Sequence, residues 1–204
     1  GGLSEGRITA GRWMATFAEA LGTFAAGLTP SGLPLEVAEK AAHLLLDTAG
    51  VALAAAPEDF ARSVQEVALR LGGPPEATLW GRAERVGMTS AVLANGTLAH
   101  GLDYDDTLEE AIVHTGCCCA TAALAVGEAR RAPGAAVLAA IAAGVEVMAA
   151  VGLVAPGAFH RRGFHPTALC GPFGAAAAAG NLLSLSPAAL ATAFGLCGSQ
   201  AGGI

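Results

Sequence analysis

Two long segments with almost no charged residues most constrain what this chain can fold into. Residues 135–159 carry one charge, Glu146, and residues 163–204 carry no Asp, Glu, Lys or Arg. Both segments consist mainly of small residues, and aromatic residues make up only 5% of the chain. The β-branched and aromatic residues that strands prefer are therefore scarce. This composition predicts an all-α fold whose central helices are buried on most sides.

The same segments approach the length of a membrane-spanning helix. Prolines cut them into short pieces, and no aromatic belt flanks them. No basic segment followed by a hydrophobic core opens the chain, so we expect no secretory signal. We therefore predict a soluble, cytoplasmic protein with no membrane partner. A bundle of membrane helices is the more distant alternative.

Charge and cysteine spacing exclude several classes of function. The net charge of −6 gives no basic surface for nucleic acid. Three of the five cysteines are adjacent, at 117–119, and no two pairs have the C-x-x-C spacing of a structural zinc site. Adjacent cysteines also do not match the ligand spacing of an iron–sulfur cluster. We expect the cysteines to be reduced and buried as small hydrophobic side chains.

We expect an N-terminal segment with a first helix, residues 1–33, followed by a helical domain, residues 34–204. Apolar periodicity, prolines and glycines predict helices over 13–26, from 34 onward, and over 60–71, 89–100, 118–131, 134–146, 172–183 and 187–196. Residues 77–80 are expected to be extended, and residues 163–166 to form a turn. No internal repeat is evident.

The densest cluster of chemically reactive residues lies in the segment 95–114, NGTLAHGLDYDDTLEEAIVH. It contains His100, Asp103, Asp105, Asp106, Thr107, Glu109, Glu110 and His114. Acids and imidazoles together are the usual groups of proton-transfer chemistry. The alternative is a solvated acidic loop.

If this segment is helical, Asp103 and Thr107 lie on the same helix face, because they are four residues apart. His114, seven residues after Thr107, can lie on that face as well. An Asp beside a His can orient the ring, and a Thr hydroxyl can donate to a substrate carboxylate. Taken singly, each of these residues also has an ordinary structural role, as a helix cap, a backbone partner or a core histidine. The other four carboxylates are expected to be scaffold or surface.

A second candidate segment is GFHPT, residues 163–167. His165 lies in a turn bounded by glycine and proline, just before an uncharged helix whose N-terminus would favour a bound carboxylate. The alternative is a loop histidine that caps a helix starting at Pro172. A metal site from His100, Asp103 and His114 is possible by residue type. It lacks the i, i+4 histidine pair of the H-E-x-x-H helix, so we predict no metal.

Taken together, these segments resemble the MmgE/PrpD family, whose members include 2-methylcitrate dehydratase and cis-aconitate decarboxylase. The resemblance is carried by LLLDTAGVALAA at 44–55, ANGTLAHGLDYDDT at 94–107, GFHPTALCGPFGAAAAAGNLLSLS at 163–186 and ALATAFGLCGSQAGG at 189–203. It implies the helical domain of a homodimeric enzyme, without the α/β lid domain and truncated before the domain's C-terminal part. It places the active site at Asp103, Thr107, His114 and His165, with His100 as a neighbour.

The function implied by this resemblance is that of a lyase, specifically a hydro-lyase of the 2-methylcitrate dehydratase type. Its substrate would be a small polycarboxylate, from which histidine acid–base chemistry eliminates water without a cofactor. His114, His165 and Asp103 are the expected catalytic residues, and Thr107 and His100 the substrate-binding residues. A related decarboxylase or epimerase is the alternative within the family. A non-catalytic helical module that only dimerises is the alternative outside it.

Overall fold

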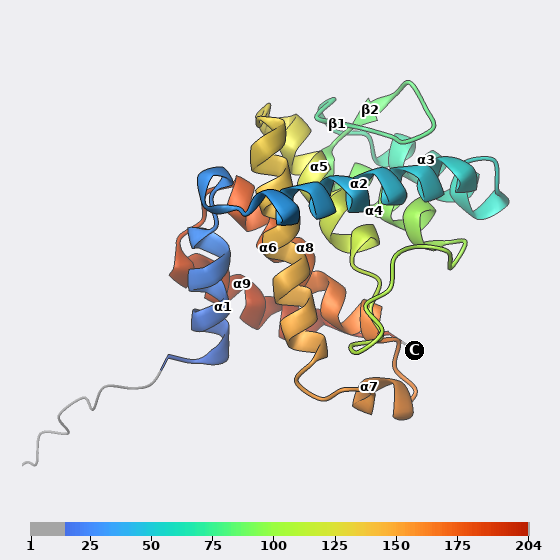
Figure 1. Ribbon diagram of the computed structural model, residues 1–204. Helices are drawn as coiled ribbons and strands as arrows, with labels where there is room; N and C mark the ends of the chain where they lie inside the picture. Colours follow the sequence, from blue (N-terminus) through green and yellow to red (C-terminus); the bar gives the residue numbers. More distant parts are fainter. Residues whose placement is uncertain (1–14, 204) are drawn as a thin grey trace, which may run out of the picture.

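The computed structural model describes residues 15–203, and residues 1–14 and 204 lie outside this description. Its elements are α1 (Phe17–Gly27), the 3-10 helix η1 (Pro30–Gly32), α2 (Leu35–Ala55), α3 (Asp59–Leu71), β1 (Ala77–Thr78), β2 (Arg85–Val86), α4 (Met88–His100), α5 (Gly116–Arg130), α6 (Gly134–Gly152), α7 (Ala158–Arg161), α8 (Pro166–Leu182) and α9 (Pro187–Gln200). The only sheet within residues 15–203 is the antiparallel pair of β1 and β2 (Figure 1). The all-α prediction is confirmed.

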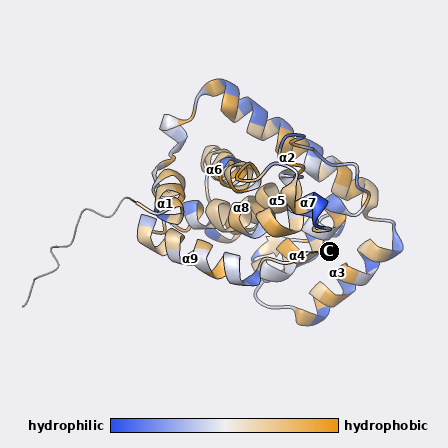
Figure 2. Cartoon of the chain, turned by 90° about the horizontal axis from the view of Figure 1, so that it is seen from below, coloured by the Kyte–Doolittle hydropathy of each residue, from blue (hydrophilic) through white to orange (hydrophobic). Residues whose placement is uncertain are grey.

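Helices α5, α6 and α8 form the centre of the molecule, where the hydrophobic colours of Figure 2 gather. α6 and α8 approach closely because glycines face each other between them. A Cβ atom at Gly144 would lie 2.8 Å from the carbonyl oxygen of Gly174, and one at Gly174 would lie 3.0 Å from that of Gly144. The Ala- and Gly-rich composition thus allows helix contacts that larger side chains would prevent.

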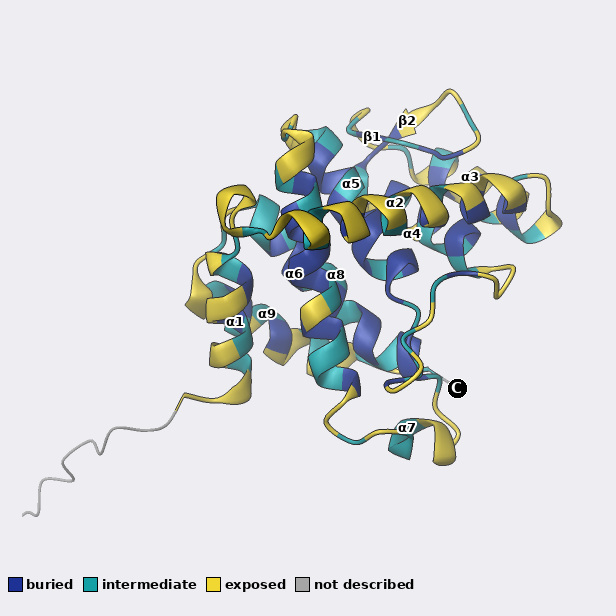
Figure 3. Cartoon of the chain, in the orientation of Figure 1, coloured by how far each residue is buried: buried dark blue, intermediate teal, exposed yellow. Residues whose placement is uncertain are grey.

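α6 is the one helix within residues 15–203 that is long and apolar enough to cross a membrane. Half of its most apolar 18-residue window is buried, and it packs against α2, α5 and α8. Ile141 and Met148 in this helix are fully buried. α6 therefore has the surroundings of a core helix. Figure 3 shows the contrast with α2, whose outward side is exposed along most of its length.

The N-terminal helix begins at Phe17, because Thr16 and Glu19 form a capping box that satisfies the first backbone N–H groups. The predicted start at Trp13 lies outside the described residues. Asn181 in α8 ties this helix to the core by donating hydrogen bonds to the carbonyl oxygens of Ala25 and Leu28, at 2.7 and 2.9 Å. The division of the chain at residues 33 and 34 stays a prediction.

α8 begins six residues earlier than the prolines indicate. Pro166 occupies the first turn, where a missing N–H costs nothing, and His165 is the N-cap residue. The prediction of a helix start at Pro172 is wrong, because Pro172 lies inside the helix. An interior proline costs about 3 kcal/mol in an isolated helix, and the buried packing of α8 offsets it. The short helix α7, just before this turn, was not predicted.

The hairpin of β1 and β2 is anchored to α4 by Asn95, which is buried. The Asn95 side chain accepts from the N–H of Trp80 at 2.9 Å and donates to the carbonyl oxygen of Thr78 at 2.9 Å. Both contacts satisfy backbone groups that would otherwise be buried without partners. α4 is thereby held in place, and its last residue, His100, enters the site described next.

The cysteines behave as the composition predicts. All five are free, and those at 117, 119 and 170 are buried while those at 118 and 197 are half-buried. Cys119 packs with Met148 in the core between α5 and α6. They act here as small apolar side chains.

Candidate active site

The segment between α4 and α5 is a folded loop rather than a continued helix. α4 ends at His100, and Asp103 has a φ of 51°, which no right-handed helix contains. Asp103 and Thr107 therefore do not share a helix face, contrary to the helical alternative. The sequence signal for this break is Gly101, directly after the last helical residue.

The loop then reverses direction through a single bridge between Leu108 and Val113. Ile112 completes the reversal with a φ of 56°. A β-branched residue in this conformation costs about 1–3 kcal/mol, which the surrounding structure must offset. The reversal brings His114 back beside the end of α4, so the loop shape is what assembles the site.

Three imidazoles meet at the ends of three helices. His100 ends α4, His114 lies two residues before α5, and His165 is the N-cap residue of α8. Their ring centroids are 4.9 Å apart for His100 and His114, 5.2 Å for His100 and His165, and 6.2 Å for His114 and His165. The Nε2 atoms of His100 and His165 are 3.0 Å apart, so one proton can be shared between them. The expected convergence of these histidines is present in the structure.

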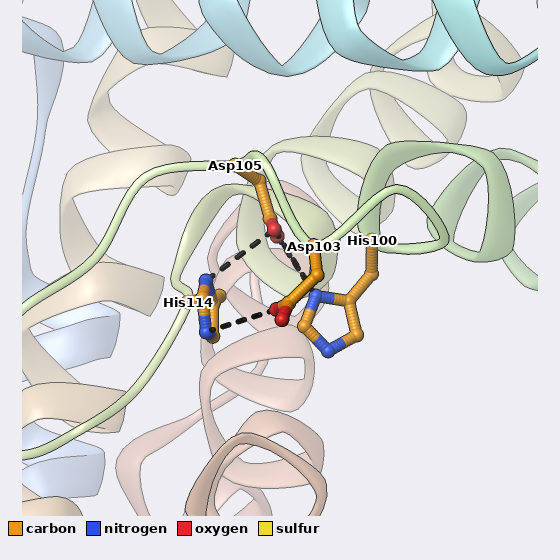
Figure 4. Close-up of side chains that lie close together, drawn as sticks. All are labelled: His100, Asp103, Asp105 and His114. Atoms are coloured by element: carbon orange, nitrogen blue, oxygen red, sulfur yellow. Dashed lines mark hydrogen bonds and ion pairs between the residues drawn. The ribbon is translucent and has the colours of Figure 1, made fainter.

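Asp105 is the carboxylate that joins two of these rings (Figure 4). Its Oδ2 atom lies 3.0 Å from Nδ1 of His100, and its Oδ1 atom lies 3.3 Å from Nδ1 of His114. The Asp105 side chain is fully buried, whereas that of Asp103 is 84% exposed and lies 3.9 Å from Nε2 of His114. Asp105 was expected to be a scaffold or surface residue, because burial within an acidic loop leaves no sequence pattern.

The network shifts the protonation equilibria of its members in different directions. The hydrogen bond to Asp105 raises the pKa of His100, despite the opposing effect of burial. Burial opposes ionisation of Asp105, but the hydrogen bond and the charge of His100 outweigh it and lower the pKa of Asp105. Burial and the positive charges of the other two rings lower the pKa of His165. Neighbouring imidazoles with opposite shifts are typical of acid–base sites.

Two threonines complete the surroundings of His114. The Oγ1 atom of Thr107 lies 3.4 Å from Nδ1 of His114, and the Thr107 residue is exposed. Thr167, in the first turn of α8, accepts a hydrogen bond from the backbone N–H of His114 at 3.0 Å. Thr107 can therefore reach a bound molecule, while Thr167 fixes the backbone of His114 against α8.

Asp106 has a structural role, as predicted for the remaining carboxylates. It accepts hydrogen bonds from the N–H groups of Thr115 and Gly116 at 2.9 and 2.8 Å and from the Thr115 hydroxyl at 2.7 Å. It thus caps α5, whose own N-cap residue makes no side-chain cap. Glu109 and Glu110 are exposed.

We expect Asp106→Ala to lower the free energy of unfolding by about 1.5 kcal/mol, because it leaves the partly buried N–H groups at the start of α5 without an acceptor. Denaturant unfolding followed by circular dichroism measures this. Glu109→Ala, an exposed carboxylate of the same loop, is the control and should change stability by less than about 0.5 kcal/mol. Equal effects of the two variants would contradict the capping role.

The site also contains the atoms of a possible cation site. One ligand atom from each of His100, Asp103, Asp105 and His114 lies within 4.8 Å of the others. The Nδ1 atoms of both histidines face Asp105, which gives these donors partners within the protein. The prediction that no metal is used therefore stays a prediction.

A cavity of about 730 Å³ lies beside the site, between α2 and α6. Thr107 is the one proposed site residue that lines it, so its side chain stands between this cavity and the imidazoles. The ionisable residues in its wall are Glu36, Lys40, His43, Asp47, Asp106 and Glu146. Carboxylates outnumber the lysine, so this cavity is electrostatically unfavourable for a polyanion. A polycarboxylate fits better on the imidazole side of Thr107.

Three imidazoles at the ends of helices, two of them in contact with a buried carboxylate, form the candidate active site of a helical domain. The chain belongs to the MmgE/PrpD family, since the model of the MmgE/PrpD N-terminal domain matches residues 19–204. The family recognised from the sequence blocks is thus confirmed.

Curated relatives agree with this assignment. The chain is 31% identical to the cis-aconitate decarboxylase-like protein oryM of Aspergillus oryzae, over 87% of this chain and 38% of that protein. It is 27% identical to the cis-aconitate decarboxylase of Homo sapiens, over 90% and 39%, and 25% identical to that of Aspergillus terreus, over 89% and 38%. The chain therefore spans about two fifths of the length of the relatives it matches.

Proposed function

We propose that the protein carrying this chain is a lyase of the 2-methylcitrate dehydratase type, which eliminates water from a small hydroxy-polycarboxylate. The observation that carries this proposal is the cluster of three imidazoles, two of which contact the buried carboxylate of Asp105. Elimination of water needs a base and an acid at the same time, and an imidazole can serve as either. Membership of the MmgE/PrpD family, and similarity to proteins named as decarboxylases, which are lyases, support the proposal.

In the proposed reaction, one imidazole removes a proton from a carbon next to a carboxylate. The electrons of that C–H bond form the carbon–carbon double bond, and the C–O bond breaks. A second imidazole gives an N–H proton to the departing hydroxyl, which leaves as water. His114 and His165 are the two proton-transfer residues, and Asp103 stabilises positive charge on His114.

The substrate is held by groups next to these rings. Thr107 donates its hydroxyl hydrogen to a substrate carboxylate, and protonated His100 supplies a positive charge close by. Both residues lie close to His114. The Oγ1 atom of Thr107 is 3.4 Å from Nδ1 of His114, and the ring centroids of His100 and His114 are 4.9 Å apart. A module that only dimerises would have no need for a carboxylate buried between two imidazoles, which favours an enzyme over that alternative.

A decarboxylase is the second candidate, because the curated relatives are named cis-aconitate decarboxylases. That reaction breaks a carbon–carbon bond, releases CO₂ and places a proton on carbon, so the same imidazoles would serve. An epimerase would remove and return the proton at one carbon. Elimination fits the site better, since it uses two separate proton-transfer groups in one step.

Turnover of a short series of acids tests the proposal. The natural protein that contains this chain is incubated with 2-methylcitrate, citrate and cis-aconitate, while enoate absorbance and CO₂ release are followed. We expect enoate to form from 2-methylcitrate without CO₂. Release of CO₂ from cis-aconitate, with no dehydration, would establish the decarboxylase instead. Absence of both would contradict a lyase.

Turnover should not depend on a metal ion. We expect prolonged treatment with EDTA, followed by gel filtration, to leave kcat within about twofold of its starting value, because imidazoles provide both proton transfers. Metal analysis of the treated protein is the control. A loss of activity that Zn²⁺, Mn²⁺ or Mg²⁺ restores would assign the cluster of His100, Asp103, Asp105 and His114 to a cation instead.

We further propose that this protein works in the cytoplasm as a homodimer. Both proposals follow from the family resemblance. Sedimentation of the natural protein tests the second, and a mass of one chain would contradict it.

A further inference from the structure

Asp105 is the one carboxylate of the loop that contacts two imidazoles while its side chain is fully buried. Both of its contacts are to Nδ1 atoms, at 3.0 Å for His100 and 3.3 Å for His114. An ionised carboxylate only accepts hydrogen bonds. The Nδ1 atom of His100 must therefore carry a hydrogen whenever Asp105 is charged. The carboxylate 3.3 Å away favours a hydrogen on Nδ1 of His114 too, where the Thr107 oxygen at 3.4 Å is a second possible acceptor, and the Nε2 atom is then the variable position on each ring.

The two Nε2 atoms have different surroundings. Nε2 of His114 points toward the exposed carboxylate of Asp103, 3.9 Å away, so it can accept a proton and have the new charge stabilised. Nε2 of His100 lies 3.0 Å from Nε2 of His165 and can donate to it. Among residues 15–203, Nδ1 of His165 makes no hydrogen bond, so this nitrogen is free for a substrate.

We propose that Asp105 is a positioning residue that divides the chemistry between the histidines, with His114 as the base and His165 as the acid. Asp105 holds His114 with Nε2 unprotonated and ready to take the carbon-bound proton. It also holds His100 in its protonated form. As His165 gives its Nδ1 proton to the departing hydroxyl, His100 gives its Nε2 proton to Nε2 of His165. His114 gains one proton and His100 loses one, while His165 gives one proton and receives one and so stays neutral. The substrate loses one water.

This assignment rests on the proposed function and adds the order of the two histidines to it. The ionisable groups that face His100 are Asp103, Asp105 and His114 from the loop, Cys118 from α5 and His165 from α8. Of these, Asp105 makes the direct hydrogen bond, and this bond is the largest cause of the raised pKa of His100. The lowered pKa of His165 favours its neutral ring, whose bare Nε2 atom can accept the proton of His100.

The test uses the natural protein with ¹⁵N-labelled histidine, followed by NMR from pH 5 to 9. In the wild type we expect the neutral ring of His114 to carry its hydrogen on Nδ1. We also expect His100 to keep its extra proton to a higher pH than an ordinary histidine. In Asp105→Asn, His100 should lose that proton at lower pH. Glu110→Gln, which changes an exposed carboxylate in the same loop, should leave the His100 titration and the His114 tautomer unchanged.

Activity gives an independent readout. We expect Asp105→Asn to lower kcat by about 10- to 100-fold with a smaller change in KM, which is the range found for groups that orient a metal-bound imidazole. The fall of kcat at high pH should move to lower pH, because less His100 remains protonated. Asp105→Glu should recover part of the loss. If Asp105 only stabilised the fold, its replacement would not move the pH dependence of kcat.

The outcomes separate the two proposals. Titration shifts as expected without turnover of any tested acid would leave the positioning role intact and overturn the proposed function. Turnover with a His100 titration that is ordinary in the wild type, or unchanged in Asp105→Asn, would overturn the positioning role. If Asp105→Asn fails to fold, the tautomer of His114 in the wild type still decides, since an Nε2–H tautomer would contradict the assignment.

Discussion

Replacing His114 or His165 by alanine is expected to lower kcat by about 10²- to 10⁴-fold, the usual contribution of a general acid or base. Each ring supplies one of the two proton transfers in the proposed elimination, and no other imidazole within residues 15–203 lies in the cluster besides His100. KM should change less than kcat, because the lost interaction belongs to the transition state. Steady-state kinetics with 2-methylcitrate and cis-aconitate measure both constants.

His160→Ala is the matched control for these variants. His160 lies on α7, five residues before His165, and is exposed. We expect its replacement to leave kcat within about twofold, as for a surface substitution. Near-normal turnover in both His114→Ala and His165→Ala would remove these residues from the mechanism.

Gly144→Val is expected to lower the free energy of unfolding by about 3 kcal/mol, the upper end of the usual cost of overpacking a core. A Cβ atom at this position would lie 2.8 Å from the Gly174 carbonyl oxygen and 3.1 Å from the Cβ atom of Cys119. These atoms belong to the backbone and to a short side chain, so α6 and α8 must move apart. Denaturant unfolding measures the loss.

The same substitution at Gly195 gives the control. Gly195 lies in α9, is exposed, and has nothing within 4 Å of an added Cβ atom. Valine there should change stability by less than about 0.5 kcal/mol, since its helix propensity is slightly better than that of glycine. Equal losses at the two positions would mean that the contact between α6 and α8 is not the cause.

Much of the fold could be predicted from the sequence, because its strongest signals are local. The helix ending at Leu71 is predicted by Gly72, which adopts a φ of 62° there. The boundaries that differ are those where tertiary packing overrides local preference. Pro172 lies inside α8 although an interior proline destabilises a helix, because neighbouring helices bury α8 on several sides.

The candidate site could be predicted in part. The types of residue and the family blocks pointed to His114 and His165, and the structure places both rings in one cluster with His100. Asp105 was missed, because its importance depends on burial and on the reversal at Ile112. A positive φ at isoleucine has no sequence signature, so the loop shape could not be foreseen.

Proton exchange at carbon tests the central claim most directly. The natural protein is incubated in D₂O with 2-methylcitrate and, separately, with cis-aconitate, and the recovered acids are examined by mass spectrometry. If the imidazoles of this site move a proton at a carbon next to a carboxylate, the substrate or product gains deuterium at carbon, and His114→Ala and His165→Ala gain far less. Recovery of both acids unlabelled and unconverted would contradict the account.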